Sequence, residues 1–130
     1  MKNNNILITG GAGYIGSHIA EALVKKKVNI FILDNLKTGF RKLINNKAIF
    51  IKGDIKNIIT VRKVINDNNI TDIIHLAASL NVSEAEKNKK KYFSNNIKGT
   101  LNLVKSCKGS TVKNIIFSSS CSIYGNVNGA

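Results

Sequence analysis

The sequence predicts an α/β fold, in which a parallel sheet of about five strands carries helices on both faces. Two observations support this prediction. Short, continuous apolar runs rich in isoleucine recur along the 130 residues, and such runs are typical of strands buried on both faces of a parallel sheet. Stretches with helical periodicity separate the runs, and this alternation implies right-handed βαβ crossovers. We therefore expect residues 1–130 to form one domain with a sizeable core.

Five segments are predicted to form the strands of this sheet. They are residues 5–9 (NILIT), 28–33 (VNIFIL), 48–51 (AIFI), 72–77 (DIIHLA) and 114–119 (NIIFSS). No internal repeat, low-complexity tract or linker interrupts their succession.

Three segments between the strands are predicted to be amphipathic helices. Their apolar residues recur at helical spacing, so each helix should place one face against the sheet. The expected faces are Ile15, Ile19, Ala22 and Leu23 in residues 14–26, Ile58, Val61, Val64 and Ile65 in residues 57–68, and Phe93, Ile97, Leu101 and Val104 in residues 91–107.

The formal charge of +13 comes almost entirely from lysine, because Arg41 and Arg62 are the only arginines. A basic face for nucleic acid is the functional alternative. However, the lysine runs at 25–27 and 88–92 fall where helix ends and solvated faces are expected, without aromatic interleaving. We therefore expect no nucleic-acid partner, although the positive field favours anionic small ligands.

The remaining composition argues against membrane and metal functions. No apolar run approaches the roughly 20 residues that a membrane span requires. Residues 1–9 lack the features of a signal peptide, so we expect no membrane partner and a cytoplasmic location. Cys107 and Cys121 belong to no CxxC or Cys/His cluster, and we interpret them as reduced structural thiols with no metal.

A glycine-rich motif follows the first predicted strand. In "TGGAGYIGSH", Gly10, Gly13 and Gly16 are spaced three apart and a helix should begin at about Tyr14. Gly10 can make the tight turn, Gly13 lets a pyrophosphate approach the backbone, and Gly16 lets helix and strand pack closely. The phosphate charge would then meet the free N–H groups at the helix amino terminus. The motif predicts a Rossmann-type, doubly wound, dinucleotide-binding domain.

Asp34 stands at the end of the second strand, where such folds need an acid for the adenosine ribose hydroxyls. A turn or capping aspartate is the alternative interpretation. A carboxylate there repels a 2′-phosphate, so NAD is favoured over NADP. Lys37 and Arg41 lie close enough in sequence to leave that preference open.

Two further strand ends should border the same cleft. "KGDI" at 52–55 contains Asp54, which could meet the adenine amino group or be only a turn aspartate. "HLAAS" at 75–79 ends the fourth strand with small residues, which leave room for a cofactor across the carboxyl ends of the strands. We interpret His75 as a packed core residue rather than a base, and His18 as a still weaker candidate.

Six motifs in this order resemble the amino-terminal part of an extended short-chain dehydrogenase/reductase, most closely the UDP-glucose 4-epimerase family. They are "ILITGGAGYIGSH", "ILDNLKTGFR", "KGDI", "IIHLAAS", "NNIKGTLNLV" and "VKNIIFSSSCSIYG". The resemblance covers essentially the whole chain.

The resemblance implies a set of NAD-contacting residues. Tyr14 and Ile15 would lie against the pyrophosphate. Asp34, Asn35, Leu36, Lys37, Thr38 and Gly39 would surround the adenosine ribose, Asp54 and Ile55 would flank adenine, and Leu76, Ala77, Ala78, Ser79, Leu80 and Asn95 would line the path toward nicotinamide. Ser120 matches the catalytic serine, which hydrogen-bonds the reacting hydroxyl of a UDP-sugar substrate, whereas Tyr124 matches a tyrosine that is not catalytic.

The resemblance also implies a tyrosine base with a lysine four residues later, and no Tyr-x-x-x-Lys occurs here. We therefore expect a truncated chain that lacks the substrate domain and has no epimerase activity by itself. The family homodimer is also doubtful, because the helix that opens with this motif forms half of its contact. The sequence departs from residues common in the family at Leu80, Ala85 and Lys89, and these departures concern the nicotinamide side of the implied site. A stand-alone NAD-binding remnant and part of a nucleotide-sugar 4,6-dehydratase are the alternatives, although "SSSCSIYG" follows the epimerase form.

Overall fold

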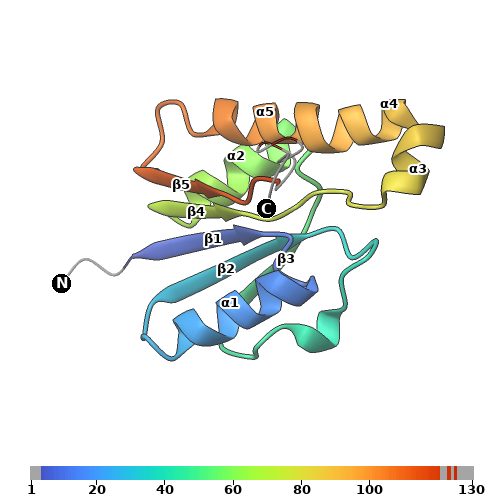
Figure 1. The fold of residues 1–130 in the computed structure, drawn as a ribbon. Coiled ribbons are helices and arrows are strands. Elements are labelled where there is room, and N and C mark those ends of the chain that lie inside the picture. Colours follow the sequence, from blue (N-terminus) through green and yellow to red (C-terminus); the bar gives the residue numbers. More distant parts are fainter. Residues whose placement is uncertain (1–3, 121–122, 124, 126–130) are drawn as a thin grey trace.

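The computed structural model describes residues 4–120, 123 and 125, and its central feature is a five-stranded parallel sheet (Figure 1). The strands are β1 (Asn5–Thr9), β2 (Asn29–Asp34), β3 (Ile49–Lys52), β4 (Asp72–His75) and β5 (Asn114–Phe117). All five lie within one or two residues of the predicted segments. The predicted α/β fold class is confirmed.

The strand order is β3-β2-β1-β4-β5, so the chain starts near the centre of the sheet, moves outward to β3 and returns to β4. Thr9 at the end of β1 is in register with Leu33 on one side and His75 on the other. The carboxyl ends of the strands therefore meet at one edge, and the order reverses between β1 and β4. Open α/β sheets bind ligands at such a point.

Helices cover both faces of the sheet (Figure 1). On one face lies α1 (Tyr14–Val24), and on the other lie α2 (Ile58–Asp67) and α5 (Gly99–Ser106). The π-helical segment η2 (Phe93–Lys98) joins α5 to α4 (Lys89–Tyr92) in one long helix. No helix in the described part of the chain has the length and apolar character that crossing a membrane requires.

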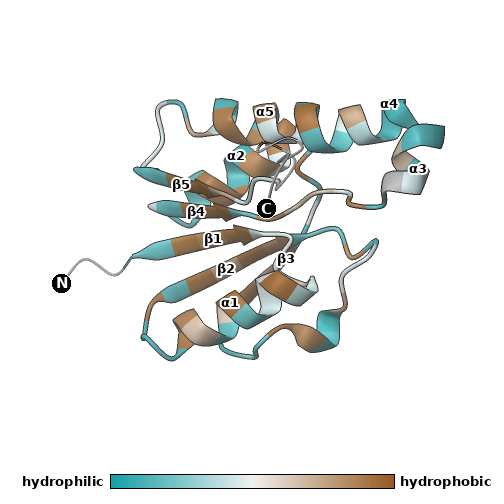
Figure 2. Ribbon diagram, viewed as in Figure 1, coloured by the Kyte–Doolittle hydropathy of each residue, from teal (hydrophilic) through white to brown (hydrophobic). Residues whose placement is uncertain are grey.

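Strands β1, β2 and β4 contribute to the core on both faces of the sheet, and Figure 2 shows their apolar colouring. Leu7, Leu33 and Ile73 pack beneath α2 and α5, whereas Ile8 and Ile32 pack beneath α1. Each fully buried aliphatic side chain contributes about 1.5–3 kcal/mol relative to an exposed one. Burial on both faces explains the continuous apolar runs of β1, β2 and β4. The prediction of burial on both faces is wrong for the edge strands β3 and β5, because Ile49 is 52% exposed and Ile115, Ile116 and Phe117 are 39–63% exposed.

The predicted buried faces agree with the structure to different degrees. In α2, Val61, Val64 and Ile65 are buried as predicted, and the Asn57 side chain caps the helix by accepting the N–H groups of Ile59 and Thr60 at 3.1 Å. In α1 the prediction is partly wrong. There the buried residues are Gly16, Ser17 and Ala20, since close helix–sheet contact selects small side chains. Ala22 is exposed, as is Ile15, at 56%.

The predicted face of residues 91–107 is wrong. Phe93, Ile97, Leu101 and Val104 share one face, but that face is turned away from the sheet and they are 47–51% exposed. Leu103 is completely buried instead. A Cβ at Gly99 would lie 2.7 Å from the Ile55 Cδ1 atom, so this helix approaches the core through small residues. Its buried side also contains Ser106, whose hydroxyl donates to the Asn102 carbonyl at 2.7 Å. A search for apolar periodicity does not detect such a polar residue.

Three short features were not predicted. Helix α3 (Val82–Lys87) begins after Asn81, whose Oδ1 accepts the Glu84 N–H at 3.0 Å. Asn88 caps α4 in the same way, with Lys91 N–H as the donor at 3.1 Å. The 3₁₀ helix η1 (Arg41–Leu43) lies between β2 and β3. Asparagine caps thus begin two short helices in a stretch where the sequence analysis predicted no helix before residue 91.

Candidate functional site

The β1–α1 loop and the first turn of α1 pack so closely that Gly10 in the loop and Gly16 in the helix accept only glycine. Gly10 has a φ of +74°, and a Cβ there would lie 2.8 Å from the backbone nitrogen of Ala77. A Cβ at Gly16 would lie 2.5 Å from the Gly10 carbonyl oxygen. Both contacts are too short for a side chain, so these glycines let the loop, helix α1 and the segment after β4 come together.

Helix α1 begins at this loop with its first N–H groups uncapped by any side chain. Its N-cap residue is Gly13, and the helix starts at Tyr14. A Cβ at Gly13 would meet only the Gly10 carbonyl oxygen, at 3.3 Å. Tyr14 and Ile15 are exposed beside the helix start. The helix terminus thus offers donors and partial positive charge at an accessible surface, which suits a phosphate group.

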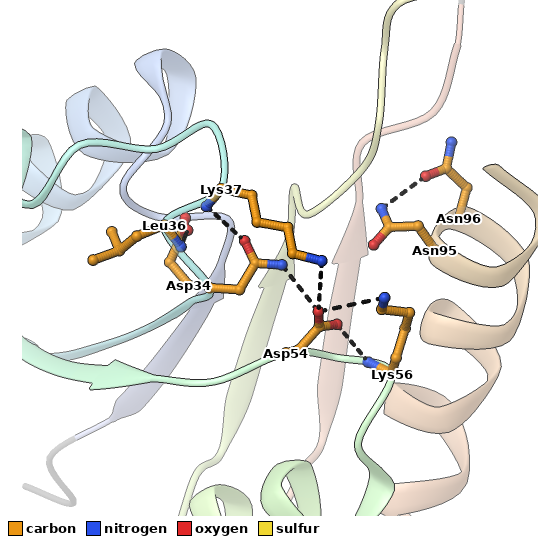
Figure 3. A network of polar contacts seen from close by, with 8 residues as sticks. Asp34, Leu36, Lys37, Asp54, Lys56, Asn95 and Asn96 are labelled. Carbon is orange, nitrogen blue, oxygen red and sulfur yellow. Dashed lines mark hydrogen bonds and ion pairs between the residues drawn. The ribbon is translucent and has the colours of Figure 1, made fainter. Parts of the chain in front are cut away.

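Asp34 lies beside the same loop (Figure 3). Its Oδ2 atom accepts the N–H of Ala12 at 3.0 Å, and its Oδ1 atom accepts the N–H of Leu36 at 2.8 Å. The second bond supports a tight turn in which Leu36 has a φ of +59°. Asp34 is therefore a turn aspartate and also a carboxylate held next to the glycine loop, since the two interpretations are compatible.

Residues 35–39 follow Asp34 along the glycine loop. A Cβ at Gly39 would lie 2.8 Å from the Ala12 Cβ, and Phe40 N–H donates to the Ala12 carbonyl at 2.9 Å. Asn35 Oδ1 accepts the Lys37 N–H at 3.0 Å, which closes a second small turn. The structure thus gathers the predicted ribose segment, namely Asp34, Asn35, Leu36, Lys37, Thr38 and Gly39, along one side of the glycine loop.

Asp54 lies two residues after β3, within a group of cationic and amide side chains (Figure 3). Asn35 Nδ2 donates to its Oδ2 atom at 3.1 Å and Lys56 N–H donates to its Oδ1 atom at 3.0 Å. The ammonium groups of Lys56 and Lys37 lie 3.6 and 4.0 Å from Oδ2. Burial raises the pKa of Asp54, but these hydrogen bonds and charges outweigh burial and hold the pKa below its ordinary value.

The next residue, Ile55, has a different environment from the one expected for a cofactor contact. Its side chain is buried at 4% exposure in the core cluster beneath α2 and α5. The Ile55 side chain therefore belongs to the hydrophobic core, and its backbone is the part that can face a ligand.

The segment after β4 crosses the same edge of the sheet. Leu76 N–H donates to the Thr9 carbonyl at 3.0 Å, and the Ala77 backbone packs on Gly10. Ser79 is held by Asn96 of η2, while Leu80 is exposed. Asn95 Nδ2 donates to Asn96 Oδ1 at 3.0 Å. Sequence reasoning singled out Asn95 and missed Asn96, because only the folded chain brings Asn96 to Ser79.

His75 is buried at 3% exposure, which confirms the prediction of a packed core residue. Its Nδ1 atom lies 2.6 Å from Thr9 Oγ1, and its Nε2 atom lies 2.9 Å from Thr100 Oγ1. Burial lowers the pKa of His75 to about 4, because the charged imidazolium would lose its hydration. His75 is therefore neutral at physiological pH, and it joins β1, β4 and α5.

Ser120 lies just beyond β5 and is exposed, with its carbonyl accepting the Ile123 N–H at 3.3 Å. Ser118 N–H donates to the His75 carbonyl at 3.2 Å, so the chain after β5 starts at the same edge of the sheet. Cys121 and Tyr124, which the sequence singled out nearby, fall outside the described residues.

The residues of this edge fit a dinucleotide. The space above Gly13 and the uncapped start of α1 suit a pyrophosphate, and the Asp34 carboxylate suits ribose hydroxyls. An all-parallel sheet with these features defines the class of dinucleotide-binding domains. The family model described as "NAD dependent epimerase/dehydratase family" matches residues 6–130, so the chain belongs to that family.

Curated relatives include UDP-glucose 4-epimerases. The Lactobacillus helveticus enzyme is 42% identical over 120 residues, which cover 92% of this chain and 36% of that protein. The Klebsiella pneumoniae sequence is 39% identical over 127 residues, covering 92% of this chain and 91% of that sequence. The family resemblance seen in the sequence is confirmed.

Solved structures of UDP-glucose 4-epimerases share the fold. One has a TM-score of 0.93 at 37% identity and covers 97% of this chain and 38% of its own. The Brucella ovis enzyme in complex with NAD has a TM-score of 0.89 at 37% identity and covers 95% and 38%. The chain thus spans little more than a third of the length of most of these relatives.

Proposed function

We propose that this chain binds NAD and represents the cofactor-binding portion of a UDP-glucose 4-epimerase. The observation that carries the proposal is the 3.0 Å hydrogen bond from Ala12 N–H to Asp34, which sets a ribose-binding carboxylate beside the glycine loop. Family membership and the similarity to an epimerase in complex with NAD support it.

Each strand end contributes a different group to the proposed site. Gly10, Gly13 and Gly16 bring the backbone and the α1 amino terminus to the pyrophosphate. Asp34 binds the adenosine ribose, and Asp54 with Asn35 borders the adenine. Bound NAD supplies the hydride acceptor, while the segment Leu76–Leu80 and Asn95 orient its nicotinamide half.

The surroundings of Asp34 favour NAD over NADP. A carboxylate at this position repels a 2′-phosphate, and the two nearby cations have other partners. Lys37 Nζ lies 4.0 Å from Asp54, and the Arg41 guanidinium stacks over the Phe50 ring at 4.7 Å. These partners draw both cations away from Asp34, which supports NAD rather than NADP as the cofactor.

Epimerisation requires more than these residues provide. The substrate of the proposed reaction is a UDP-sugar whose C4 hydroxyl would hydrogen-bond to Ser120. The 130 residues contain no Tyr-x-x-x-Lys pair to take up the hydroxyl proton. The chain by itself therefore binds NAD without turnover.

Calorimetry with NAD tests the binding proposal. Asp34→Ala should weaken NAD binding roughly tenfold or more, because hydrogen bonds to a charged group contribute about 1.5–3 kcal/mol. Asp67→Ala is the matched control, since Asp67 is an exposed aspartate at the end of α2, paired with Lys63. Equal NAD affinity of the wild type and Asp34→Ala would refute the ribose-binding role.

A second measurement addresses turnover. The purified chain should not convert UDP-galactose in the presence of NAD. Genuine conversion would show that these residues suffice for catalysis, and conversion that persists in Ser120→Ala would show that Ser120 is not catalytic.

A further inference from the structure

We propose that Asn96 is a positioning residue that holds the segment Leu76–Leu80 in the conformation that the nicotinamide half of NAD requires. The inference rests on the proposed NAD-binding function and adds a residue to it. Asn96 lies in η2, on the helix opposite the segment, and its carboxamide joins the two.

The Asn96 side chain pairs with both backbone polar groups of Ser79. Its Oδ1 atom accepts the Ser79 N–H at 2.8 Å, and its Nδ2 atom donates to the Ser79 carbonyl at 3.0 Å. Residues 76–81 belong to neither a helix nor a strand. Asn96 therefore does for this segment what a neighbouring strand does for a sheet, because it satisfies an N–H and a C=O of the same residue.

The carboxamide oxygen of Asn96 is fully used within the protein. This Oδ1 atom also accepts Nδ2–H of Asn95 at 3.0 Å, so both lone pairs of that oxygen are used. This second bond orients the Asn95 side chain, which Figure 3 shows beside the helix on the side of the Asp54 network. Asn96 thus fixes two groups of the proposed nicotinamide path, namely the Ser79 backbone and the Asn95 side chain.

A partly buried chain of hydrogen bonds holds the backbone of Asn96 in place. Thr100 Oγ1–H donates to the backbone carbonyl of Asn96 at 2.6 Å. The Thr100 oxygen must therefore accept the proton on His75 Nε2, 2.9 Å away. His75 Nδ1 is then an acceptor for Thr9 O–H at 2.6 Å. Thr9 directly precedes Gly10, and the chain of hydrogen bonds therefore connects the glycine loop to the segment after β4.

The backbone around Asn96 is itself unusual. Residues Phe93–Lys98 form a π-helical segment, in which the hydrogen bonds span one residue more than in an α-helix. Such segments occur frequently at functional sites. Here the wider turn carries Asn95 and Asn96 in succession, with both side chains joined to each other and the second joined to the segment after β4.

Replacing Asn96 should therefore weaken the binding of the nicotinamide half of NAD and leave the binding of the ADP-ribose half unchanged. Without the carboxamide, the Ser79 peptide groups would turn to water and the segment would adopt several conformations, which NAD would have to order on binding. We expect Asn96→Ala to weaken NAD binding roughly tenfold. Binding of ADP-ribose, which lacks the nicotinamide, should stay unchanged.

The experiment compares NAD and ADP-ribose affinities of the wild type, Asn96→Ala and Asn68→Ala. Asn68 is a matched control, because its Nδ2 atom also donates to a backbone carbonyl, that of Val64 at 2.8 Å, but at the end of α2. Hydrogen exchange of the Ser79 amide is measured in parallel and should become faster in Asn96→Ala alone. Unchanged exchange would overturn the pairing, and an equal loss of both affinities would overturn the selective role.

Asn96→Asp provides the second variant if Asn96→Ala does not fold. It keeps an acceptor for Ser79 N–H but sets an oxygen against the Ser79 carbonyl, so NAD affinity should again fall relative to ADP-ribose. NAD affinity equal to wild type in either folded variant would refute the inference while leaving the proposed function intact. A wild type that binds ADP-ribose but not NAD would also refute it, whereas one that binds neither would refute the proposed function.

Discussion

The two aspartates at the strand ends of this domain occupy similar positions in the sequence but have different surroundings. Asp34 ends β2 and Asp54 lies two residues after β3. Asp34 accepts two backbone N–H groups beside the glycine loop, whereas Asp54 lies among two lysines and an amide. The first arrangement leaves a carboxylate bordering the ligand edge. The second already neutralises the charge, so we expect Asp34 to dominate cofactor binding.

His75 gives the molecule a pH dependence that follows from burial. An ordinary histidine has a pKa of about 6.5 when unfolded, whereas the pKa of His75 is lowered to about 4 in the fold. The unfolded state therefore binds the extra proton in this window, and stability must fall as the pH drops from about 6.5 toward 4. The free energy of unfolding should decrease by about 1 kcal/mol between pH 6 and pH 5.

Urea unfolding at pH 7, 6 and 5 measures this effect. The exposed His18 is the control, and His18→Gln should retain the fall in stability, whereas His75→Gln should remove most of it at the expense of lower stability at pH 7. If His75→Gln showed the same pH dependence as the wild type, the effect would have to be assigned to another group.

The residues of the site were predictable wherever a local pattern reports on them. Glycine spacing and the distance to the second strand end are enough to find Gly10 and Asp34. Asn96 and Thr100 carry no such signal, because their partners Ser79 and His75 lie 17 and 25 residues away. Ile55 shows a different limit of the sequence analysis. The family resemblance implied that it flanks adenine, whereas its side chain packs in the core.

At the level of elements, the long helix shows why an apolar stripe does not by itself identify the buried side. Phe93, Ile97, Leu101 and Val104 form the more regular stripe, yet they face away from the sheet. The sheet-facing side holds Leu103 with Gly99 and Ser106. The periodicity in the sequence reports hydrophobicity alone. A buried helix face can also consist of small residues and of polar groups whose hydrogen bonds are complete. Helix α2 lacks such competition, and its face was predicted correctly.

Two leucines in the same helix test this orientation. Leu103→Ala removes a fully buried side chain and should destabilise the fold by about 2–5 kcal/mol. Leu101→Ala, at 50% exposure, should cost less than about 1 kcal/mol. Chemical denaturation of both variants gives the comparison. A larger loss for Leu101→Ala than for Leu103→Ala would mean that the outer stripe is the buried one.

On the scale of the whole molecule, charge is the dominant property. Twenty lysines and arginines face seven aspartates and glutamates, so most cations have no carboxylate to pair with. The resulting self-repulsion destabilises the compact state. Anionic ligands such as a dinucleotide diphosphate would be attracted by the same field.

Salt should therefore stabilise this protein. Raising the ionic strength from about 0.01 M to 0.15 M shortens the screening length from roughly 30 Å to 8 Å. The melting temperature should rise by about 4 °C, the shift that roughly 1 kcal/mol produces in a domain of this size. Lys26→Gln removes one charge from the lysine run at 25–27 and should reduce the difference. A melting temperature that falls with salt would contradict the argument.

The pairing of β1 with β4 also determines when the ligand edge can form. Thr9 and His75 are neighbours in the sheet but 66 residues apart in the chain. Closing so long a loop makes folding slow, and sheets dominated by such distant contacts fold in milliseconds to seconds. On the ribosome, at roughly 5–20 residues per second, β1 would wait several seconds for β4. During that interval β1 can pair only with β2, and the ligand edge between β1 and β4 does not yet exist.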